Sequence, residues 1–176
     1  MLVGITGSGK STLLKYIITN LFTRSKILIY DSEHEHEPYT KNIRVFRPSE
    51  TYSIEQFERM NQWIYETGNI IYCIENIDFF AKREKPLPFW FAKIVGLGRK
   101  RNIGLIMTTR RIADVHKTVC SQVKVWFLFR QFLPNDVYYL KQFIGEIAYK
   151  LKDLKQYHFI AYRIGEKPKV YMPINV

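Results

Sequence analysis

One stretch near the N-terminus constrains the fold more than any other feature of the chain. Residues 4–12 read Gly-Ile-Thr-Gly-Ser-Gly-Lys-Ser-Thr, which fits the pattern G-x-x-x-x-G-K-[ST] of a phosphate-binding loop. The stretch follows a short apolar run, Met1 to Val3, and precedes residues whose apolar positions recur at helical spacing. The pattern therefore predicts a strand, a glycine-rich loop and a helix in immediate succession.

The residue types in the loop indicate its chemistry. Glycines let the backbone curl until successive N–H groups point inward at the positive end of the following helix, which creates an anion site. A lysine there reaches the β- and γ-phosphates, the next hydroxyl ligates Mg²⁺, and the following threonine lies near the α-phosphate. The predicted binding residues for a nucleoside triphosphate are Gly4, Thr6, Gly7, Ser8, Gly9, Lys10, Ser11 and Thr12, with Ser11 also on the metal.

The chain of 176 residues is the size of one domain, and we expect a single domain over residues 1–176. No apolar run approaches the ~18 residues that a membrane span needs. The glycine loop begins so early that it leaves no room for a secretory signal. We therefore expect a cytoplasmic protein with Cys73 and Cys120 as reduced thiols.

The charge is strongly positive and unevenly distributed. The chain has 27 Lys and Arg against 16 Asp and Glu, a formal net charge of +11. Residues 82–111 contain a single acid, Glu84, among nine basic residues: Lys82, Arg83, Lys85, Lys93, Arg99, Lys100, Arg101, Arg110 and Arg111. Such a cluster favours a polyanionic partner, nucleic acid first. A basic surface without a partner is the alternative.

Strand-like and helix-like segments alternate along most of the chain. Strands are predicted at 26–30, 43–47, 70–74, 103–107 and 123–129, with helices after the glycine loop, from Ser53 to Gly68, from Pro88 and from Pro134. Two alternating runs, 157–164 and 168–174, predict a C-terminal β-hairpin. The alternation predicts an α/β fold with a mostly parallel sheet covered by helices.

Acidic residues follow two of these strands. Residues 31–37, which include Asp31 and Glu35, follow the strand at 26–30, and Glu75 and Asp78 follow the strand at 70–74. The carboxyl ends of parallel strands form the edge at which α/β proteins bind ligands. We therefore expect these carboxylates near the phosphate loop.

Taken together, the glycine loop, the acidic turn, the segment at 71–78 and the segment at 96–115 (GLGRKRNIGLIMTTRRIADV) resemble the HerA/FtsK branch of P-loop ATPases. The resemblance is greatest to small viral genome-packaging ATPases, including those of archaeal icosahedral viruses with an internal membrane. It covers roughly residues 1–145. It implies a RecA-like, additional-strand sheet of order 5-1-4-3-2, a hexameric ring, Mg²⁺-dependent ATP hydrolysis and movement along double-stranded DNA. A capsid or membrane component is a further partner that it implies.

In this resemblance Glu75 occupies the position of the metal-associated acid, and Asn76 that of the glutamate that activates water. An asparagine can orient water but cannot accept its proton. Glu35 is our first candidate for the missing base, followed by Asp31 and Asp78. Alternatively, Glu75 serves both metal and water.

The resemblance also assigns basic residues. Arg99 matches the arginine that reaches a neighbouring subunit's γ-phosphate, with Arg101 as the alternative. Thr109 and Arg110 stand where the family has a Thr-Gln sensor pair. Lys82, Arg83 and Lys85 follow the second motif, in a loop that could contact DNA phosphates or simply be solvated.

Several residues favour plainer interpretations. His34 and His36 alternate with Glu33 and Glu35, a weak metal pattern without a distant ligand set. The three tryptophans, Trp63, Trp90 and Trp126, are expected in the core rather than on a base-stacking surface.

Other functions stay open from the sequence alone. They are a secretion or conjugation-type assembly ATPase, a nucleotide or small-molecule kinase, and a nucleotide-binding subunit with little turnover.

Overall fold

Strands and helices alternate as the sequence pattern predicts. The computed structural model describes residues 1–174. Within this range one sheet contains β1 (Leu2–Val3), β2 (Ile27–Tyr30), β3 (Ile43–Phe46), β4 (Ile70–Ile74), β5 (Ile103–Thr109), β6 (Val125–Leu128), β7 (Phe159–Arg163) and β8 (Lys169–Tyr171). The strands from β1 to β6 pair in parallel, and β7 and β8 are antiparallel. The α/β fold class is therefore confirmed.

The order of the strands corrects the prediction in part. The described residues give the order β3-β2-β4-β5-β1-β6-β7-β8. The five-strand order 5-1-4-3-2 corresponds to the inner series from β6 to β2, but it omits strands at both edges. β3 pairs in parallel outside β2, after a connection over residues 31–42. The predicted C-terminal hairpin extends the other edge through the β6–β7 pair.

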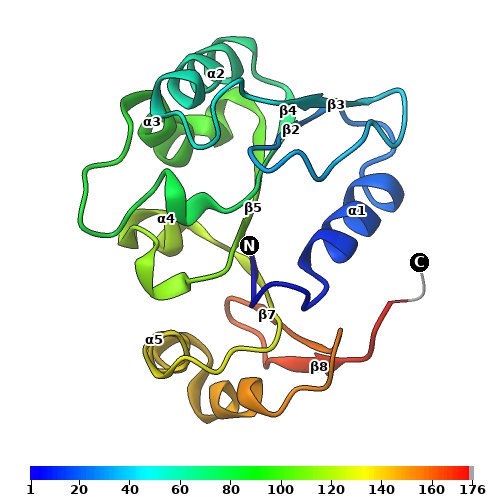
Figure 1. Cartoon of the computed structure of the whole chain (residues 1–176), viewed down its shortest axis with the longest axis vertical. Coiled ribbons are helices and arrows are strands. Elements are labelled where there is room, and N and C mark those ends of the chain that lie inside the picture. The colour runs from blue at the N-terminus through cyan, green and yellow to red at the C-terminus, as the bar shows by residue number, and fades with distance from the viewer. Residues whose placement is uncertain (175–176) are drawn as a thin grey trace.

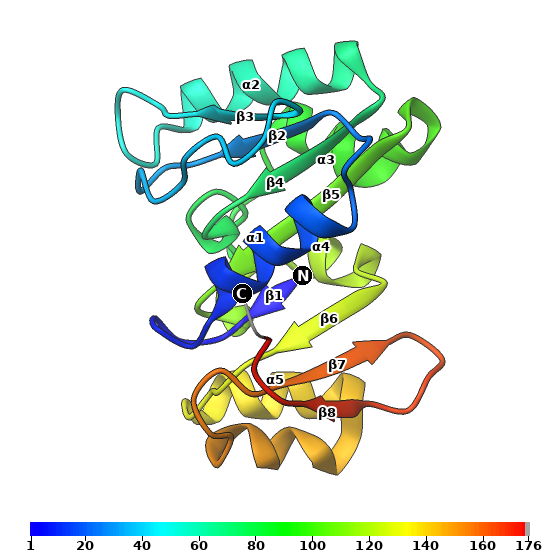
Figure 2. The ribbon, with the colours of Figure 1, turned by 90° about the vertical axis from the view of Figure 1, so that its right-hand side faces the viewer.

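Helices cover both faces of the sheet. They are α1 (Lys10–Asn20), α2 (Ile54–Thr67), α3 (Phe89–Leu97), α4 (Lys117–Gln122) and α5 (Pro134–Ile144), with 3-10 turns η1 (Ile77–Phe79), η2 (Gly98–Arg101), η3 (Ile112–Asp114) and η4 (Gly145–Lys152). Figure 1 shows α1 on one side of the sheet and the other labelled helices on the opposite side. Figure 2, turned by 90°, shows α1 crossing in front of the strands.

Capping residues explain the ends of α2. The Ser53 side chain accepts a hydrogen bond from the Gln56 backbone N–H, which satisfies a donor of the first turn. The Gln56 side chain bonds Ser49 instead of reaching back to Ser53, so only half of the predicted capping box forms. Gly68, at a φ of 62°, ends the helix where glycine has no Cβ to strain.

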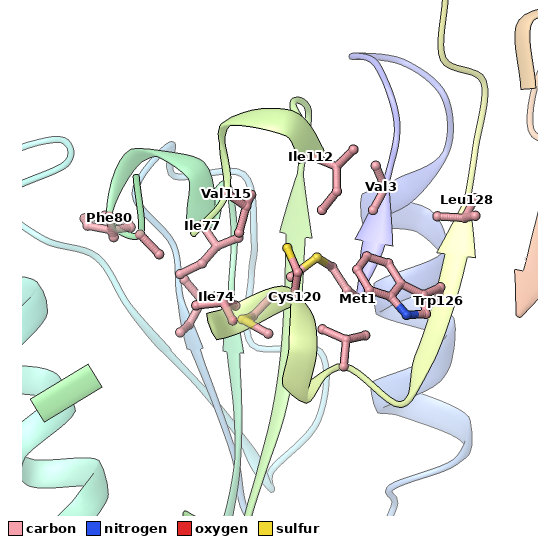
Figure 3. Packing of buried hydrophobic residues seen from close by; sticks show 14 of the residues in the cluster. Met1, Val3, Ile74, Ile77, Phe80, Ile112, Val115, Cys120, Trp126 and Leu128 are labelled. Atoms are coloured by element: carbon pink, nitrogen blue, oxygen red, sulfur yellow. The ribbon is translucent and has the colours of Figure 1, made fainter. Parts of the chain in front are cut away.

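The larger hydrophobic core lies on the face opposite α1. Figure 3 shows Met1, Val3, Cys120, Trp126 and Leu128 converging there from β1, α4 and β6. Trp126 is buried as predicted, whereas Trp63 is 44% exposed, so the prediction that it belongs to the core is wrong. Trp63 lies on the outer side of α2. Helical periodicity alone did not show that Trp63 is at the margin of the apolar face of this helix rather than at its centre. Trp90 is half-buried.

The two cysteines are free thiols, and both are buried. Burial raises the pKa of the Cys120 thiol, so it stays protonated within the core. No helix among residues 1–174 is long and apolar enough to cross a membrane.

Candidate functional site

The phosphate loop is fixed between the ends of two neighbouring strands. The Gly4 N–H donates to the Thr109 carbonyl at the end of β5 (3.1 Å), and the Ile5 N–H donates to the Arg130 carbonyl after β6 (3.2 Å). Gly4 must be glycine because a Cβ there would lie 2.6 Å from the Phe129 Cβ. Gly9 has a φ of 104° immediately before α1. The loop is therefore held at the N-terminus of a helix, as an anion site requires.

Lys10 lies inside this loop. Its Nζ donates to the Ile5 carbonyl at 3.0 Å, and the residue is 8% exposed. Burial and the nearby Arg110 charge lower the pKa of Lys10 to about 8, opposed by the charges of Glu75, Asp78 and Glu35. The Lys10 ammonium group therefore lies near the carboxylates that were predicted at the carboxyl ends of the strands.

Ser11 and Glu75 meet beside Lys10. The Ser11 Oγ donates to the Glu75 Oε1 at 3.3 Å, and Glu75 is 2% exposed at the end of β4. Hydroxyl and carboxylate oxygens are the ligands that Mg²⁺ prefers. This donor pair fits the metal position predicted for Ser11 and Glu75.

His36 is a site residue that the sequence reasoning missed. It is 1% exposed, and its Nε2 forms an ion pair with the Glu75 Oε2 at 3.1 Å, while its Nδ1 lies 2.6 Å from the Tyr39 hydroxyl. Burial alone would lower the pKa of His36, but the contact with Glu75 and the nearby carboxylates outweigh burial and raise it. The charged imidazolium is therefore favoured against the carboxylate.

Asp31 explains why His36 points inward. Its two carboxylate oxygens accept the backbone N–H groups of Glu35 (3.0 Å) and His36 (2.8 Å). These bonds fold residues 31–36 into a tight turn with His34 at a φ of 59°. Since Asp31 is buried and both of its carboxylate oxygens accept backbone N–H groups, the geometry disfavours Asp31 as the group that activates water.

Two other candidate bases lie in different surroundings. Burial is the main cause that raises the pKa of Asp78, and its Oδ1 accepts the Thr109 hydroxyl at 2.6 Å. Glu35 is exposed on the turn, and burial together with the charges of Glu75 and Glu33 raises its pKa. Of these acids Glu35 is the exposed one, and the charge of Glu75 acts on it.

Asn76 adopts a left-handed conformation with a φ of 50°, and its N–H donates to the Thr108 hydroxyl at 3.0 Å. The residue is 4% exposed, immediately after β4. Its amide carries no titratable group, so any role with water is limited to orientation.

Arg110 is paired within the site. It forms a salt bridge with Glu33, which also accepts the Tyr52 hydroxyl. Burial alone would raise the pKa of Glu33, but the bonds from Tyr52 and Arg110 lower it. The predicted sensor arginine is therefore held by a carboxylate of the acidic turn, close enough to Lys10 to lower its pKa.

Arg99 and Arg101 lie at the amino ends of the parallel strands, away from the carboxyl ends that hold the phosphate loop. They belong to η2, directly before β5, whereas Thr109 ends that strand, roughly 20 Å away at the usual rise per strand residue. Arg101 bonds the carbonyls of Tyr65 and Glu66 at the end of α2. Among residues 1–174 the Arg99 side chain makes no hydrogen bond or ion pair. Arg99 therefore cannot serve the phosphate loop of its own chain, and of the two it is the arginine available to another.

The basic loop after β4 is anchored to residues 113–115. The Arg83 N–H donates to the Asp114 carbonyl at 2.7 Å and its guanidinium to the Ala113 carbonyl at 3.1 Å, and Lys82 forms an isolated bridge with Val115. The Arg83 side chain is nevertheless exposed, so contact of this loop with DNA phosphates stays a prediction. The Lys82 and Lys85 side chains are exposed.

No group of three or more His, Cys, Asp or Glu side chains within residues 1–174 could hold a metal ion. In particular, His34 lies near the Pro48 carbonyl while His36 faces Glu75. The alternation of histidine and glutamate in this turn gives one inward imidazole rather than a ligand set.

The parallel sheet, the phosphate loop and the acid after β4 together are those of the P-loop NTPase fold. Residues 2–71 match a family described as the central domain of the helicase HerA. No protein with curated annotation matches the chain.

Solved structures match almost the entire chain. The genome packaging NTPase B204 from Sulfolobus turreted icosahedral virus 2, in complex with ATP-gammaS, has a TM-score of 0.80 at 23% identity, over 99% of this chain and 96% of B204. Its complex with AMPPCP gives 0.78 at 25% identity, over 98% and 96%. EssC from Geobacillus thermodenitrificans gives 0.69 at 14% identity, over 99% of this chain and 39% of EssC.

These comparisons confirm the predicted resemblance. The chain resembles P-loop NTPases of the HerA/FtsK type: part of it matches the HerA central-domain family, and its fold is similar to that of a small viral genome-packaging NTPase.

Proposed function

We propose that this chain is a single-domain ATPase motor that moves double-stranded DNA, most specifically a genome-packaging ATPase. The observation that carries the ATPase assignment is the meeting of Lys10, Ser11 and Glu75 at the phosphate loop. The similarity to B204 over nearly the whole of both chains supports packaging as the work that ATP hydrolysis drives.

Different groups of the loop would bind different parts of the triphosphate and its metal. Backbone N–H groups of residues 4–12 surround the phosphates, and Lys10 pairs with the β- and γ-phosphates. Ser11 and Glu75 would hold Mg²⁺, which neutralises charge on the phosphate oxygens when bound. His36 keeps the Glu75 carboxylate in place from the other side.

Glu35 is the proposed base. Its raised pKa favours taking a proton from water, because a carboxylate of higher pKa is a stronger base. Asn76 would orient the same water without accepting its proton. Arg110, released from Glu33, would reach the γ-phosphate, and Thr109 would hold Asp78 beside it.

The site would be completed in a ring, with a hexamer as the expected size. Arg99 lies at the amino end of β5, opposite the carboxyl ends that hold the phosphate loop, so it suits contact with the nucleotide of a neighbouring subunit. An arginine supplied in this way neutralises charge that develops during phosphoryl transfer.

DNA would be contacted by the exposed side chains of Lys82 and Lys85, with Arg83 bracing their loop. Filter binding of double-stranded DNA over a range of salt concentrations tests this role. The double variant Lys82→Ala with Lys85→Ala should bind more weakly and with a shallower salt dependence, because two phosphate contacts are lost. Lys150→Ala with Lys152→Ala, which removes the same charge from η4, is the matched control. Equal affinity and salt dependence in the wild type and the loop variant would contradict the DNA contact.

A secretion or assembly ATPase is the second candidate, because EssC and the type VII secretion ATPase EccC share this fold. In that case the ring and Arg99 keep their roles, and the basic surface is incidental. A rate of ATP hydrolysis that does not change with double-stranded DNA but rises with a protein substrate would favour this candidate. For the packaging function, we expect the protein in the host cytoplasm or the virion, with a capsid or membrane component as its docking partner.

A further inference from the structure

An aromatic side chain from the C-terminal segment lies against the phosphate loop. A Cβ placed on Gly9 would come within 3.1 Å of the Tyr157 Cδ1 and 3.7 Å of the Tyr157 Cα. The same point is 3.4 Å from the Phe129 Cε1. Tyr157 therefore packs beside the first turn of α1, although 148 residues separate it from Gly9 in the chain.

The backbone of Tyr157 is held in an unusual conformation. Its φ is 64°, within a turn closed by the His158 N–H and the Lys155 carbonyl at 3.1 Å. At this position of a turn a positive φ favours glycine, and an aromatic residue there is strained. Strained residues of this kind gather at ligand sites. The ring is not part of the core, because Tyr157 is 49% exposed.

The order of the strands places Tyr157 on a particular side of the loop. The loop follows β1, and the series runs β4-β5-β1-β6-β7. Glu75, at the end of β4, marks the side of the metal and the terminal phosphate. Tyr157 precedes β7, which pairs with β6, and so lies on the opposite side. Figure 2 shows β4 and β7 on opposite sides of β1.

A bound triphosphate must extend in the same direction. Its γ-phosphate would lie at Lys10 and the metal position beside Glu75, so the nucleoside at the other end of the phosphate chain would be directed away from Glu75. The ribose and base therefore leave the loop on the side of Tyr157.

We propose that Tyr157 is the base platform of this nucleotide site, with its exposed ring stacking on the face of the adenine. The proposal rests on nucleotide binding at the phosphate loop. A ring face recognises the flat surface of a base rather than its hydrogen-bonding edge. Selection between adenine and guanine is therefore not expected from Tyr157, and the contact should act on affinity.

The test compares ATP with inorganic tripolyphosphate, which carries the same phosphates without a base. Dissociation constants for both, each with Mg²⁺, are measured by calorimetry for the wild type, Tyr157→Gly and Tyr157→Phe. Glycine suits the positive φ, so Tyr157→Gly removes the ring without straining the turn. Tyr138→Ala, which removes a 65% exposed tyrosine from α5, is the matched control.

Tyr157→Gly should weaken ATP binding by roughly 5- to 100-fold, the range expected from loss of one base-stacking contact. It should leave tripolyphosphate binding unchanged, and Tyr157→Phe should bind ATP as the wild type does. Unchanged ATP affinity in Tyr157→Gly, or equal loss for both ligands, would overturn the platform.

Failure of the proposed nucleotide site gives a different result. In that case the wild type binds neither ATP nor tripolyphosphate, or Lys10→Ala binds both as well as the wild type does. A wild type that binds both ligands equally tightly would retain the phosphate site and overturn only the base platform.

Discussion

The ion pair between His36 and Glu75 should stabilise the fold as well as the site. His36→Ala removes the imidazolium and leaves the Glu75 Oε2 buried without a charged partner. The two side chains are 1% and 3% exposed, and their atoms lie 3.1 Å apart. Breaking a buried pair by removing one partner costs about 3–5 kcal/mol.

The lower end of this range applies here, because Ser11 still donates to the other oxygen of Glu75. We therefore expect His36→Ala to lower the free energy of unfolding by about 3 kcal/mol. For a chain of this size that corresponds to a fall in Tm of about 6–12 °C.

A double-mutant cycle with Glu75→Gln separates the ion pair from the packing of the imidazole. Free energies of unfolding from urea denaturation are measured for the wild type, both single variants and the double variant. In the Glu75→Gln background, His36→Ala should cost at least about 1.5 kcal/mol less, because no buried carboxylate is left unpaired. An equal cost of His36→Ala in both backgrounds would refute the coupling.

Three further predictions concern other residues. Asp136→Ala should lower the free energy of unfolding, measured by urea denaturation, by about 2 kcal/mol, because the buried Ala113 N–H loses its acceptor at 2.9 Å. Asp136→Asn retains an acceptor and should lower it clearly less. Burial is the main cause that raises the pKa of Asp136, so its stabilising contribution is greatest below the ordinary aspartate pKa and is lost as pH rises through the raised folded value. Asp136→Asn should then compare more favourably with the wild type at pH 7 than at pH 4, and the opposite trend would contradict the shift. Glu35→Gln should reduce the kcat of ATP hydrolysis by roughly 100-fold with little change in KM. Glu37→Gln, two residues away, should stay active as the control. Equal kcat values in the two variants would exclude Glu35 as the base. Arg99→Ala should lower ATPase activity by roughly 10³-fold. Mixing it with the inactive Lys10→Ala variant should restore part of the activity, because a shared site can then combine Lys10 from one subunit with Arg99 from the other. No recovery on mixing would argue against an arginine supplied in trans.

The sequence predicted the parts of the fold that depend on short-range patterns. The glycine loop, the helix from Ser53 to Gly68 and the C-terminal hairpin each have local signals, in glycine positions, capping residues and alternating side chains. The convergence of Ser11 and Glu75 followed from a general rule, because parallel strands bring their carboxyl ends to one edge.

The other contacts of the site could not be predicted, because they join residues that are distant in the chain or depend on which side chains of a turn point inward. The segment at 31–37 alternates histidine and glutamate, so the sequence alone does not say which side chains turn inward. Two backbone bonds to Asp31, together with the contact between the His36 ring and the Tyr39 hydroxyl, hold His36 toward Glu75. Similarly, the pairing of Arg110 with Glu33 joins residues that are distant in the chain, and neither residue carries a local signal for it.

The most direct test of the central claim is the rate of ATP hydrolysis with and without double-stranded DNA. We expect the rate to rise severalfold with DNA and to lose this rise as salt weakens the phosphate contacts. The rate should fall to background in Glu75→Gln, although that variant still binds ATP. A rate that double-stranded DNA leaves unchanged would contradict a DNA-translocating motor, and full activity in Glu75→Gln would contradict the assigned site.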